Sequence, residues 1–353
     1  MEVTPTSFFE VVSTQFENSL PFVIYNKPNS NEISGLLQSS DVLFTAETYT
    51  ESGFVFAPFD ADEVAVMIPF SESKKVSCSV GFSADDVQEI ENIEATSAEK
   101  NHISLVEKTI NEINTSAIKK IVISRTKEVQ VATFDFISVF KKLVKTYPTA
   151  FCYAWYHPKV GFWMGATPET LLTLNGNAFQ TMALAGTQPY KNTIDVLWGA
   201  KEQEEQRLVT ESIVNNLKPI TTNLQVSEVE TIKAGTLLHL RTVINGTLGD
   251  TTVKDFIYRL HPTPAVCGLP MQDAKAFILK NEGYPRRFYT GFLGELNADK
   301  THTELYVNLR CMEYVEEKLL LYVGGGITKD SDAKSEWEET ENKTQTMLNV
   351  LAK

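Results

Sequence analysis

Apolar residues recur at helical spacing in several segments of the chain. Ile103, Val106 and Ile110 follow one another at intervals of three and four residues, which places them on one face of a helix. Thr96 and Glu99 form a capping box before this run and predict that the helix begins there. We predict further helices over residues 135–146, 196–218, 271–280 and 333–352.

Runs of β-branched and aromatic residues, bounded by glycine, proline or polar residues, predict strands. These runs cover residues 121–123, 151–156, 162–164, 181–185, 304–313 and 318–323. Residues 1–90 are predicted to form alternating short strands and turns, with strands at 42–45 and 64–68. Strands and helices mix without a strict βαβ rhythm. We therefore predict an α+β fold, with large, mostly antiparallel sheets sandwiched between outer helices in αββα layers.

The composition of the chain shifts at residues 84–100, where acidic residues lead into the first of these helices. We place a domain boundary within this segment. Residues 1–92 are predicted to form an N-terminal α/β part that contributes to the same fold. Residues 93–353 are predicted to form the core that carries the chemistry.

Two pairs of glutamates lie three residues apart in predicted helices, Glu202 with Glu205 and Glu336 with Glu339. Each pair continues the apolar stripe of its helix, so all four carboxylates are predicted to point inward. Like charges at this spacing destabilise a helix by about 0.2–0.5 kcal/mol, and a bound cation would remove that penalty. Oxygen ligands favour Mg²⁺ over zinc. The alternative is a solvated acidic face, which most charge runs form.

Composition excludes several classes of protein. The 353 residues, 42% of them hydrophobic, can bury a large core, and a net charge of -13 argues against a nucleic-acid partner. Cys78, Cys152, Cys267 and Cys311 fit no zinc or redox spacing and are predicted to be reduced, mostly buried thiols. No basic leader and no stretch of ~20 apolar residues is present, so we expect neither secretion nor a membrane anchor. We expect a cytoplasmic protein.

Two residues are candidates for proton transfer. Lys120 precedes an apolar strand, and a lysine that is desolvated there can act as a general base. Lys119 is the competing candidate, and a lysine that snorkels to solvent is the simpler alternative. Glu169 follows Pro168 in a turn after a strand, where burial would raise its pKa enough for a general acid. The alternative is an exposed glutamate.

Other segments are suited to ligand binding but do not by themselves define a reaction. Arg310 lies in the predicted strand 304–313, and a buried arginine needs an anion, either a ligand carboxylate or an internal partner. The segment 184–187 ends a strand in a turn of small residues, and 261–265 is a loop stiffened by proline. Tyr289 lies in a predicted strand with permissive glycines, and the run 324–326 is predicted to be a backbone wall against a small anion.

In this order, the motifs resemble those of the chorismate-utilising enzymes, which include isochorismate, salicylate, anthranilate and aminodeoxychorismate synthases. The resemblance covers residues 93–353, and residues 1–90 add only a looser similarity. The matching segments are residues 120–125, 165–169, 184–187, 201–205, 261–265, 289–291 and 324–340.

The resemblance implies a Mg²⁺-dependent exchange of hydroxyl groups on chorismate. Lys120 would deprotonate the water that attacks C2, and Glu169 would protonate the departing C4 hydroxyl. Glu205 and Glu339, supported by Glu202 and Glu336, would hold Mg²⁺ against the ring carboxylate. Residues implied in substrate binding are Thr187, Lys201, His261, Tyr289, Arg310, Gly325, Gly326 and Lys343.

Two positions separate members of the family. Lysine at position 120 resembles enzymes that attack with water, whereas those that use ammonia usually carry glutamine there. Ala185 stands where aminodeoxychorismate synthases place a nucleophilic lysine. The resemblance therefore favours an isochorismate synthase of menaquinone or siderophore biosynthesis, with a monomer as the family default. Salicylate synthase is the nearest alternative, and a non-catalytic chorismate-binding protein is the alternative from another class.

Four residues depart from the family pattern. Glu202 replaces a usual aspartate, Gln206 a usual histidine, Gly199 a usual serine and Cys267 a usual glycine. None of these changes removes the candidate base, acid or metal carboxylates. Glu202 and Gln206 put the details of the metal shell in question.

Overall fold

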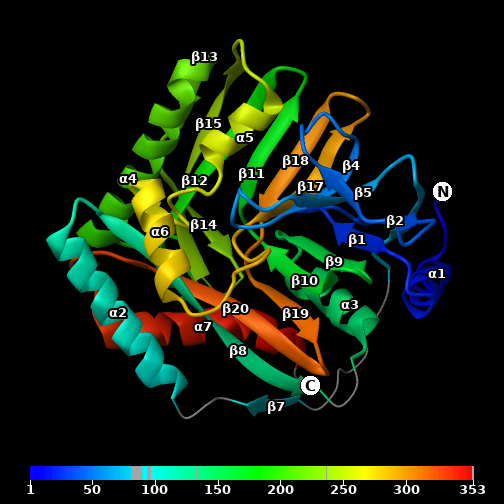
Figure 1. The fold of residues 1–353 in the computed structure, drawn as a ribbon, viewed down its shortest axis with the longest axis horizontal. Helices are drawn as coiled ribbons and strands as arrows, with labels where there is room; N and C mark the ends of the chain where they lie inside the picture. Colours follow the sequence, from blue (N-terminus) through cyan, green and yellow to red (C-terminus); the bar gives the residue numbers. More distant parts are fainter. Residues whose placement is uncertain (82–89, 94–96, 132–133, 236, 352–353) are drawn as a thin grey trace.

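The computed structural model describes residues 1–81, 90–93, 97–131, 134–235 and 237–351. Within these ranges the chain forms two sheets of ten strands each, in which neighbouring strands run antiparallel. Helices cover the outer faces of both sheets (Figure 1). The predicted α+β sandwich is therefore confirmed.

The first sheet brings together strands from both ends of the sequence. Its central path, in spatial order, is β16 (Gly268–Leu269), β8 (Lys120–Val131), β20 (Lys318–Ile327), β19 (Cys311–Val315), β10 (Gly161–Thr167), β9 (Phe151–His157), β1 (Phe22–Asn26), β2 (Glu32–Gln38) and β6 (Ser73–Ser79). Strand β7 (Ile90–Ile93) pairs with β8 off this path.

The second sheet is assembled in the same way. Its order is β13 (Thr221–Val226), β15 (Leu237–Leu248), β12 (Ala178–Pro189), β11 (Thr170–Asn175), β18 (His302–Val307), β17 (Phe292–Ala298), β4 (Gly53–Ala57), β5 (Ala65–Pro69) and β3 (Phe44–Ala46). Strand β14 (Glu230–Ala234) also pairs with β15. Strands from residues 1–81 thus extend both sheets, through β1 beside β9 and β4 beside β17.

Aromatic side chains fill the space between the two sheets. Phe151 of β9 stacks on Tyr306 of β18 with ring centroids 4.1 Å apart. Phe56 of β4 stacks in the same way on Phe288 at 4.2 Å. These rings belong to a cluster of buried residues that draws on both sheets, so burial of aromatic surface joins the layers.

The helices lie outside the sheets. Their bounds are α1 (Pro5–Glu17), α2 (Ala98–Thr115), α3 (Phe136–Thr146), α4 (Ala200–Leu217), α5 (Val253–Leu260), α6 (Met271–Asn281) and α7 (Ala333–Leu351), with a 3₁₀ turn η1 (Lys218–Ile220) after α4. Helices α1, α3 and α7 contribute to the core cluster on the first sheet, and α4 and α5 to the one on the second. Helix α7 packs on β20 and α2, in the lower half of the molecule in Figure 1.

Helix α1 corrects the prediction that residues 1–90 form only strands and turns. The Thr4 side chain accepts a hydrogen bond from the Ser7 backbone N–H, and Pro5 occupies the first turn, as is common at helix starts. Phe8 and Val12, four residues apart, are fully buried. The sequence therefore did carry a helical signal here.

The predicted strand 304–313 is wrong, because it is two strands in different sheets. β18 ends at Val307 in the second sheet and β19 starts at Cys311 in the first. Arg310, between them, has a φ of 48° that breaks the extended backbone. The apolar pattern runs through the break because both strands are buried.

Three further local predictions need revision. Residues 289–291 precede β17 in a turn rather than lying in a strand, and the glycines at 324–326 lie inside β20 rather than after it. The predicted helix 196–218 begins only at Ala200. The capping residue Thr96 and most of the acidic segment that leads into α2 lie outside the described residues.

Two expectations from composition can be compared with the structure. All four cysteines are buried free thiols, as predicted. Among the helices that the structure describes, none combines the length and apolar character needed to cross a membrane.

Candidate active site

A cleft opens where the two sheets, α4 and α7 meet. It holds about 970 Å³ of space, including the part open to solvent, which is at the upper end of the range for small-molecule sites. Most of the predicted site residues line this cleft. They are Glu169, Thr187, Lys201, Glu202, Glu205, Tyr289, Arg310, Gly325, Gly326, Glu339 and Lys343.

The glycines of β20 allow charged side chains to approach one wall of the cleft. A Cβ atom on Gly326 would lie 2.8 Å from Lys120 Cε, and one on Gly325 would lie 3.3 Å from Glu336 Oε2. A Cβ on Gly324 would lie 2.7 Å from the Ile123 carbonyl oxygen. The run is therefore required by close packing against β8 and α7.

Lys120 is only 1% exposed and lies behind the cleft wall at the start of β8. Its Nζ is 2.7 Å from Glu205 Oε1 on α4. The alternative of a lysine that snorkels into solvent is excluded by this burial. Lys119, the competing candidate, is exposed.

Three of the four predicted metal carboxylates make ion pairs with lysines. Besides Glu205, Glu336 Oε1 lies 3.2 Å from Lys201 Nζ, and Glu339 Oε1 lies 2.6 Å from Lys343 Nζ. Burial and the nearby charge of Glu339 raise the pKa of Glu336. Burial opposes ionisation of Glu339, yet Lys343 and other cations hold its pKa below the ordinary value.

Glu336 is 3% exposed and lies behind the residues that line the cleft, where it also accepts a hydrogen bond from Ser331 Oγ. Glu202 lines the cleft, but its Oε2 lies 2.5 Å from the position of a Cβ on Gly199, so the carboxylate folds back over the start of α4. The serine that usually stands at 199 would therefore need Glu202 to move.

Arg310 supplies a positive charge without an internal counter-ion. It lines the cleft, donates from Nη1 to Thr346 Oγ1 at 2.9 Å, and makes no ion pair with a carboxylate that the structure describes. Burial lowers the pKa of its guanidinium. Of the two partners that the sequence left open, an anionic ligand fits this geometry.

Glu169 carries a carboxyl group with a strongly shifted pKa. It is 3% exposed between β10 and β11, and burial raises its pKa to about 8, although the charge of Lys120 acts in the opposite direction. The carboxyl is therefore protonated at neutral pH. The alternative of an exposed glutamate is excluded.

His239 of β15 is a cleft residue that the sequence analysis missed. Its Nδ1 lies 2.9 Å from the Gly186 carbonyl oxygen and 3.4 Å from Thr187 Oγ1. Burial, followed by the charge of Arg310, lowers its pKa to about 3, so the ring is neutral. With Nδ1 donating to Gly186, Nε2 remains an acceptor, and it has no partner among the described residues. A polar histidine within the apolar run 237–240 was the available signal.

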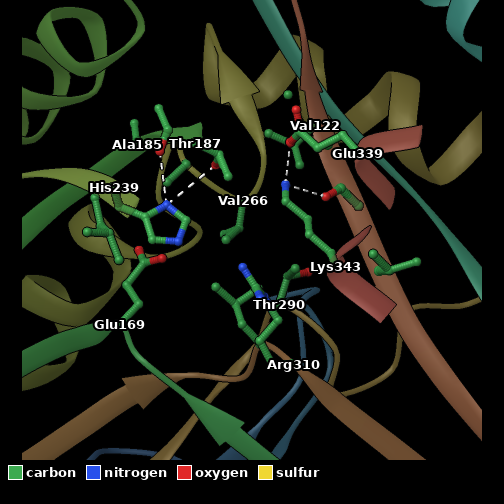
Figure 2. Close-up of a pocket in the computed structure, with 18 of the residues that line it drawn as sticks. Val122, Glu169, Ala185, Thr187, His239, Val266, Thr290, Arg310, Glu339 and Lys343 are labelled. Atoms are coloured by element: carbon green, nitrogen blue, oxygen red, sulfur yellow. Dashed lines mark hydrogen bonds and ion pairs between the residues drawn. The ribbon is translucent and has the colours of Figure 1, made fainter. Parts of the chain in front are cut away.

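The charged groups divide between two sides of the cleft. Figure 2 shows Glu169 and His239 together on one side and the Lys343–Glu339 pair on the other, with Arg310 and Thr290 between them. A proton donor thus faces the cleft from one wall, while three cations (Lys201, Arg310 and Lys343) and three glutamates (Glu202, Glu205 and Glu339) line the rest. Because Lys201 and Lys343 are paired with glutamates, Arg310 is the cation most available to an anionic ligand.

Among the predicted substrate-binding residues, His261 is the one that the structure separates from the cleft. Its ring is 3% exposed and packs against Phe292 with centroids 5.0 Å apart. Burial lowers its pKa to about 4. His261 does not line the cleft, whereas Ala265 and Val266 of the same loop do. This loop therefore contributes Ala265 and Val266, rather than His261, to the wall of the cleft.

Another group of metal-ligand residues lies outside the cleft, on β17 and β18. Potential ligand atoms of Glu295, His302 and Glu304 lie within 4.8 Å of one another, and among the described residues no other set of three His, Cys, Asp or Glu side chains meets this distance. Lys27 Nζ lies 2.6 Å from Glu295 and 2.7 Å from Glu304, so one lysine bridges the two carboxylates. Gln206 stands where the family usually has a histidine, which put the metal shell in question. Its Nε2 donates to the Ala183 carbonyl oxygen and to Thr242 Oγ1, and Gln206 does not line the cleft.

The fold and the cleft define an enzyme-like site for a small anionic ligand within an αββα sandwich. Residues 62–352 match the family described as chorismate binding enzyme. The chain belongs to this family, which confirms the resemblance found in its motifs.

Individual relatives agree with this assignment. The chain is 36% identical over 199 residues to isochorismate synthase DhbC of Bacillus subtilis, an alignment that covers 53% of this chain and 50% of that protein. It is 27% identical to the vibriobactin-specific isochorismate synthase of Vibrio cholerae, over 96% of this chain and 87% of the relative. A crystal structure of the putative 2,3-dihydroxybenzoate-specific isochorismate synthase DhbC from Bacillus anthracis superposes with a TM-score of 0.80 at 25% identity, covering 97% of this chain and 99% of that one.

Replacing Arg310 tests whether the cleft binds an anion through this side chain. We expect R310Q to weaken chorismate binding about 10- to 100-fold, since a hydrogen bond to a charged group contributes about 1.5–3 kcal/mol. The ligand-free variant should melt at a higher temperature than wild type, because an uncompensated charge has been removed. Calorimetric titration and thermal melts measure the two effects. R207Q, on the exposed face of α4, is the control and should bind chorismate as the wild type does. Unchanged affinity in R310Q would contradict the role of Arg310 in anion binding.

Proposed function

We propose that this protein is an isochorismate synthase that converts chorismate into isochorismate in a Mg²⁺-dependent reaction. The observation that carries this proposal is Glu169, a buried carboxyl in the same cleft as Arg310, which makes no ion pair with a described carboxylate; burial raises the pKa of Glu169 to about 8. Membership of the chorismate binding enzyme family and the names of the relatives support the same substrate and product. The product would feed menaquinone or catechol-siderophore biosynthesis.

Glu169 would act as the general acid. Chorismate loses its C4 hydroxyl in this reaction, and a hydroxyl leaves as water only if it gains a proton. A carboxyl that stays protonated at neutral pH can donate that proton. The neutral His239 ring, with Nε2 as an acceptor, can hold a hydroxyl or water next to the acid.

Lys120 would act as the general base. It would take a proton from the water that attacks C2 of the ring, while the double bonds shift and the C4 oxygen departs with the proton from Glu169. Lys120 lies 2.7 Å from Glu205 Oε1 in the ligand-free cleft. To act as the base, Lys120 must first lose its own proton, because an ammonium group has no lone pair with which to accept one from water.

The remaining cleft residues would bind the two carboxylates of chorismate. Arg310, Tyr289 and the backbone at Gly325 and Gly326 would hold the enolpyruvyl carboxylate. Thr187, Lys201 and Lys343 would add hydrogen bonds and positive charge. Orientation of a bound dianion in this way accounts for the part of catalysis that the acid and base do not supply.

Glu205 and Glu339 would hold Mg²⁺, with Glu202 and Glu336 in support. The oxygens of Glu336 and Glu339 lie 3.3 Å and 3.9 Å from the space that a Cβ on Gly325 would fill, and Glu205 Oε1 lies 3.2 Å from the corresponding position at Gly326. Carboxylate oxygens around an open backbone fit a hard divalent cation. When bound, Mg²⁺ would neutralise and orient the ring carboxylate. Three of these carboxylates, Glu205, Glu336 and Glu339, are paired with Lys120, Lys201 and Lys343.

Incubation of the purified protein with chorismate, with and without Mg²⁺, tests the proposed function. We expect isochorismate as the product and only when Mg²⁺ is present, with products resolved by liquid chromatography. Salicylate together with pyruvate would instead identify a salicylate synthase. Stabilisation of the protein by chorismate without any turnover would identify a binding protein that is not an enzyme.

Changing Glu169 to glutamine tests the acid. We expect E169Q to lower kcat about 10²- to 10⁴-fold while chorismate still binds. In the wild type, kcat should fall as pH rises through about 8, because the acid loses its proton there. The residual activity of E169Q should lack this alkaline limb. Steady-state kinetics from pH 6 to pH 10 measure both effects, with the exposed E204Q as control, and a limb that survives in E169Q would assign the acid elsewhere.

Adding a methyl group at Gly325 tests the metal site. We expect G325A to lose Mg²⁺-induced stabilisation, because the new Cβ would lie 3.3 Å from Glu336 Oε2. In wild type, Mg²⁺ at about 100 times its Kd should add about 2.7 kcal/mol to the free energy of unfolding. Denaturant titrations with and without Mg²⁺ give this difference. Gly81, where an added Cβ meets nothing closer than 3.9 Å, provides the matched control G81A. Full Mg²⁺ stabilisation of G325A would show that the ion binds elsewhere.

A further inference from the structure

A buried ion pair lies directly behind the cleft wall. Arg286, in the segment between α6 and β17, and Glu282, at the end of α6, have side chains only 1% and 2% exposed. Arg286 Nε donates to Glu282 Oε2 at 2.8 Å, and Nη2 donates to Oε1 of the same carboxylate. Neither residue lines the cleft. Because their charges cancel, the pair adds little net field to the site.

The other donors of Arg286 hold three separate segments of the cleft wall. Nη1 donates to the Val266 carbonyl oxygen at 2.9 Å and to Thr290 Oγ1 at 3.1 Å, and Nη2 donates to the Val122 carbonyl oxygen at 2.7 Å. All three recipients line the cleft and are labelled in Figure 2. One guanidinium therefore joins β8, the loop before β16 and the turn before β17.

The pair also completes the edge of the first sheet. Strand β16 pairs with β8 only at Lys120 and Ile121, after which the Val122 N–H donates to the Cys267 carbonyl oxygen. The N–H and C=O groups of every second residue in a strand point to the same edge. Those of Val122 and Ser124 therefore face the edge of β8 on which β16 lies, beyond the point where the pairing with β16 ends. There the Val122 carbonyl accepts from Arg286, and the Ser124 N–H donates to Glu282 Oε1 at 2.7 Å. The side chains of Arg286 and Glu282 thus make the hydrogen bonds to β8 that a longer β16 would make.

We propose that Arg286 and Glu282 form a positioning pair for the catalytic reaction. By continuing the hydrogen bonds along the edge of β8, the pair fixes the strand that carries Lys120 and sets it against the walls at Val266 and Thr290. This inference rests on the proposed function, in which Lys120 is the base. It assigns the pair no contact with the substrate.

The variant R286K tests the pair while keeping the charge opposite Glu282. A lysine ammonium has one nitrogen and cannot reach Val122, Val266 and Thr290 together with Glu282. We expect kcat for chorismate to fall about 10- to 100-fold, because small misplacements of a reacting group are costly. KM should change much less, since the cationic binding residues Arg310 and Lys343 do not contact Arg286.

A matched control separates positioning from a general loss of stability. Asn26 of β1 is 1% exposed, and its Nδ2 donates to the carbonyl oxygens of Ser30 at 3.0 Å and Glu32 at 2.8 Å, outside the cleft. N26A should therefore lower the melting temperature and leave kcat unchanged. Hydrogen exchange measured by mass spectrometry should become faster over residues 120–126 in R286K and remain unchanged there in N26A.

The outcomes distinguish the possibilities. Suppose that R286K melts at a lower temperature but keeps the kcat, the KM and the hydrogen exchange over residues 120–126 of the wild type. It would then behave like N26A, and the positioning role would be overturned. If R286K does not fold, E282Q provides the same test, because it keeps an acceptor for Ser124 but loses the charge opposite Arg286. Failure of the wild type to convert chorismate would count against the proposed function alone. The exchange comparison would then still decide whether the pair orders β8.

Discussion

The balance among the buried charges around the cleft is the constraint on which the site depends. Lysines from β8, α4 and α7 each face a glutamate, so six charges cancel in pairs at distances of 2.6 to 3.2 Å. Glu169 avoids a charge by keeping its proton, and His239 does so by losing one. Arg310 makes no ion pair with a described carboxylate, although Glu339 lies close enough for its charge to act on the guanidinium. The cleft can therefore accept an anion. Burial of its other ionisable groups costs little free energy, because most of them are paired or neutral.

The two-sheet architecture makes this balance possible because it brings distant parts of the chain to one place. The paired residues Lys120 and Glu205 are 85 positions apart, and Lys201 and Glu336 are 135 apart. These residues lie on β8, α4 and α7, whose apolar residues pack in the core clusters on the two sheets. Glycines in β20 and at the end of β12 then let α4 and α7 approach closely enough for the charges to meet.

Sequence reasoning predicted the layers, the helices with clear apolar periodicity and most residues of the cleft wall, because these follow from local spacing and from motifs. It missed features that depend on tertiary contacts. The break at Arg310 is invisible in a pattern that stays apolar on both sides of it. The neutral state of His239 follows from burial, and the lysine partners of the glutamates follow from packing between elements. No local pattern indicates the role of Arg286, because that role follows from its hydrogen bonds to segments that are distant in sequence.

Helix α7 is the last described element along the chain, and it carries both Glu339 and Lys343. Every other wall of the cleft is contributed by an earlier segment. Local opening of α7 would therefore remove Glu339 and Lys343 from the cleft together, along with Glu336, the partner of Lys201. A ligand that binds to this wall would in turn stabilise α7 against opening, so the order of the helix and the occupancy of the cleft are linked.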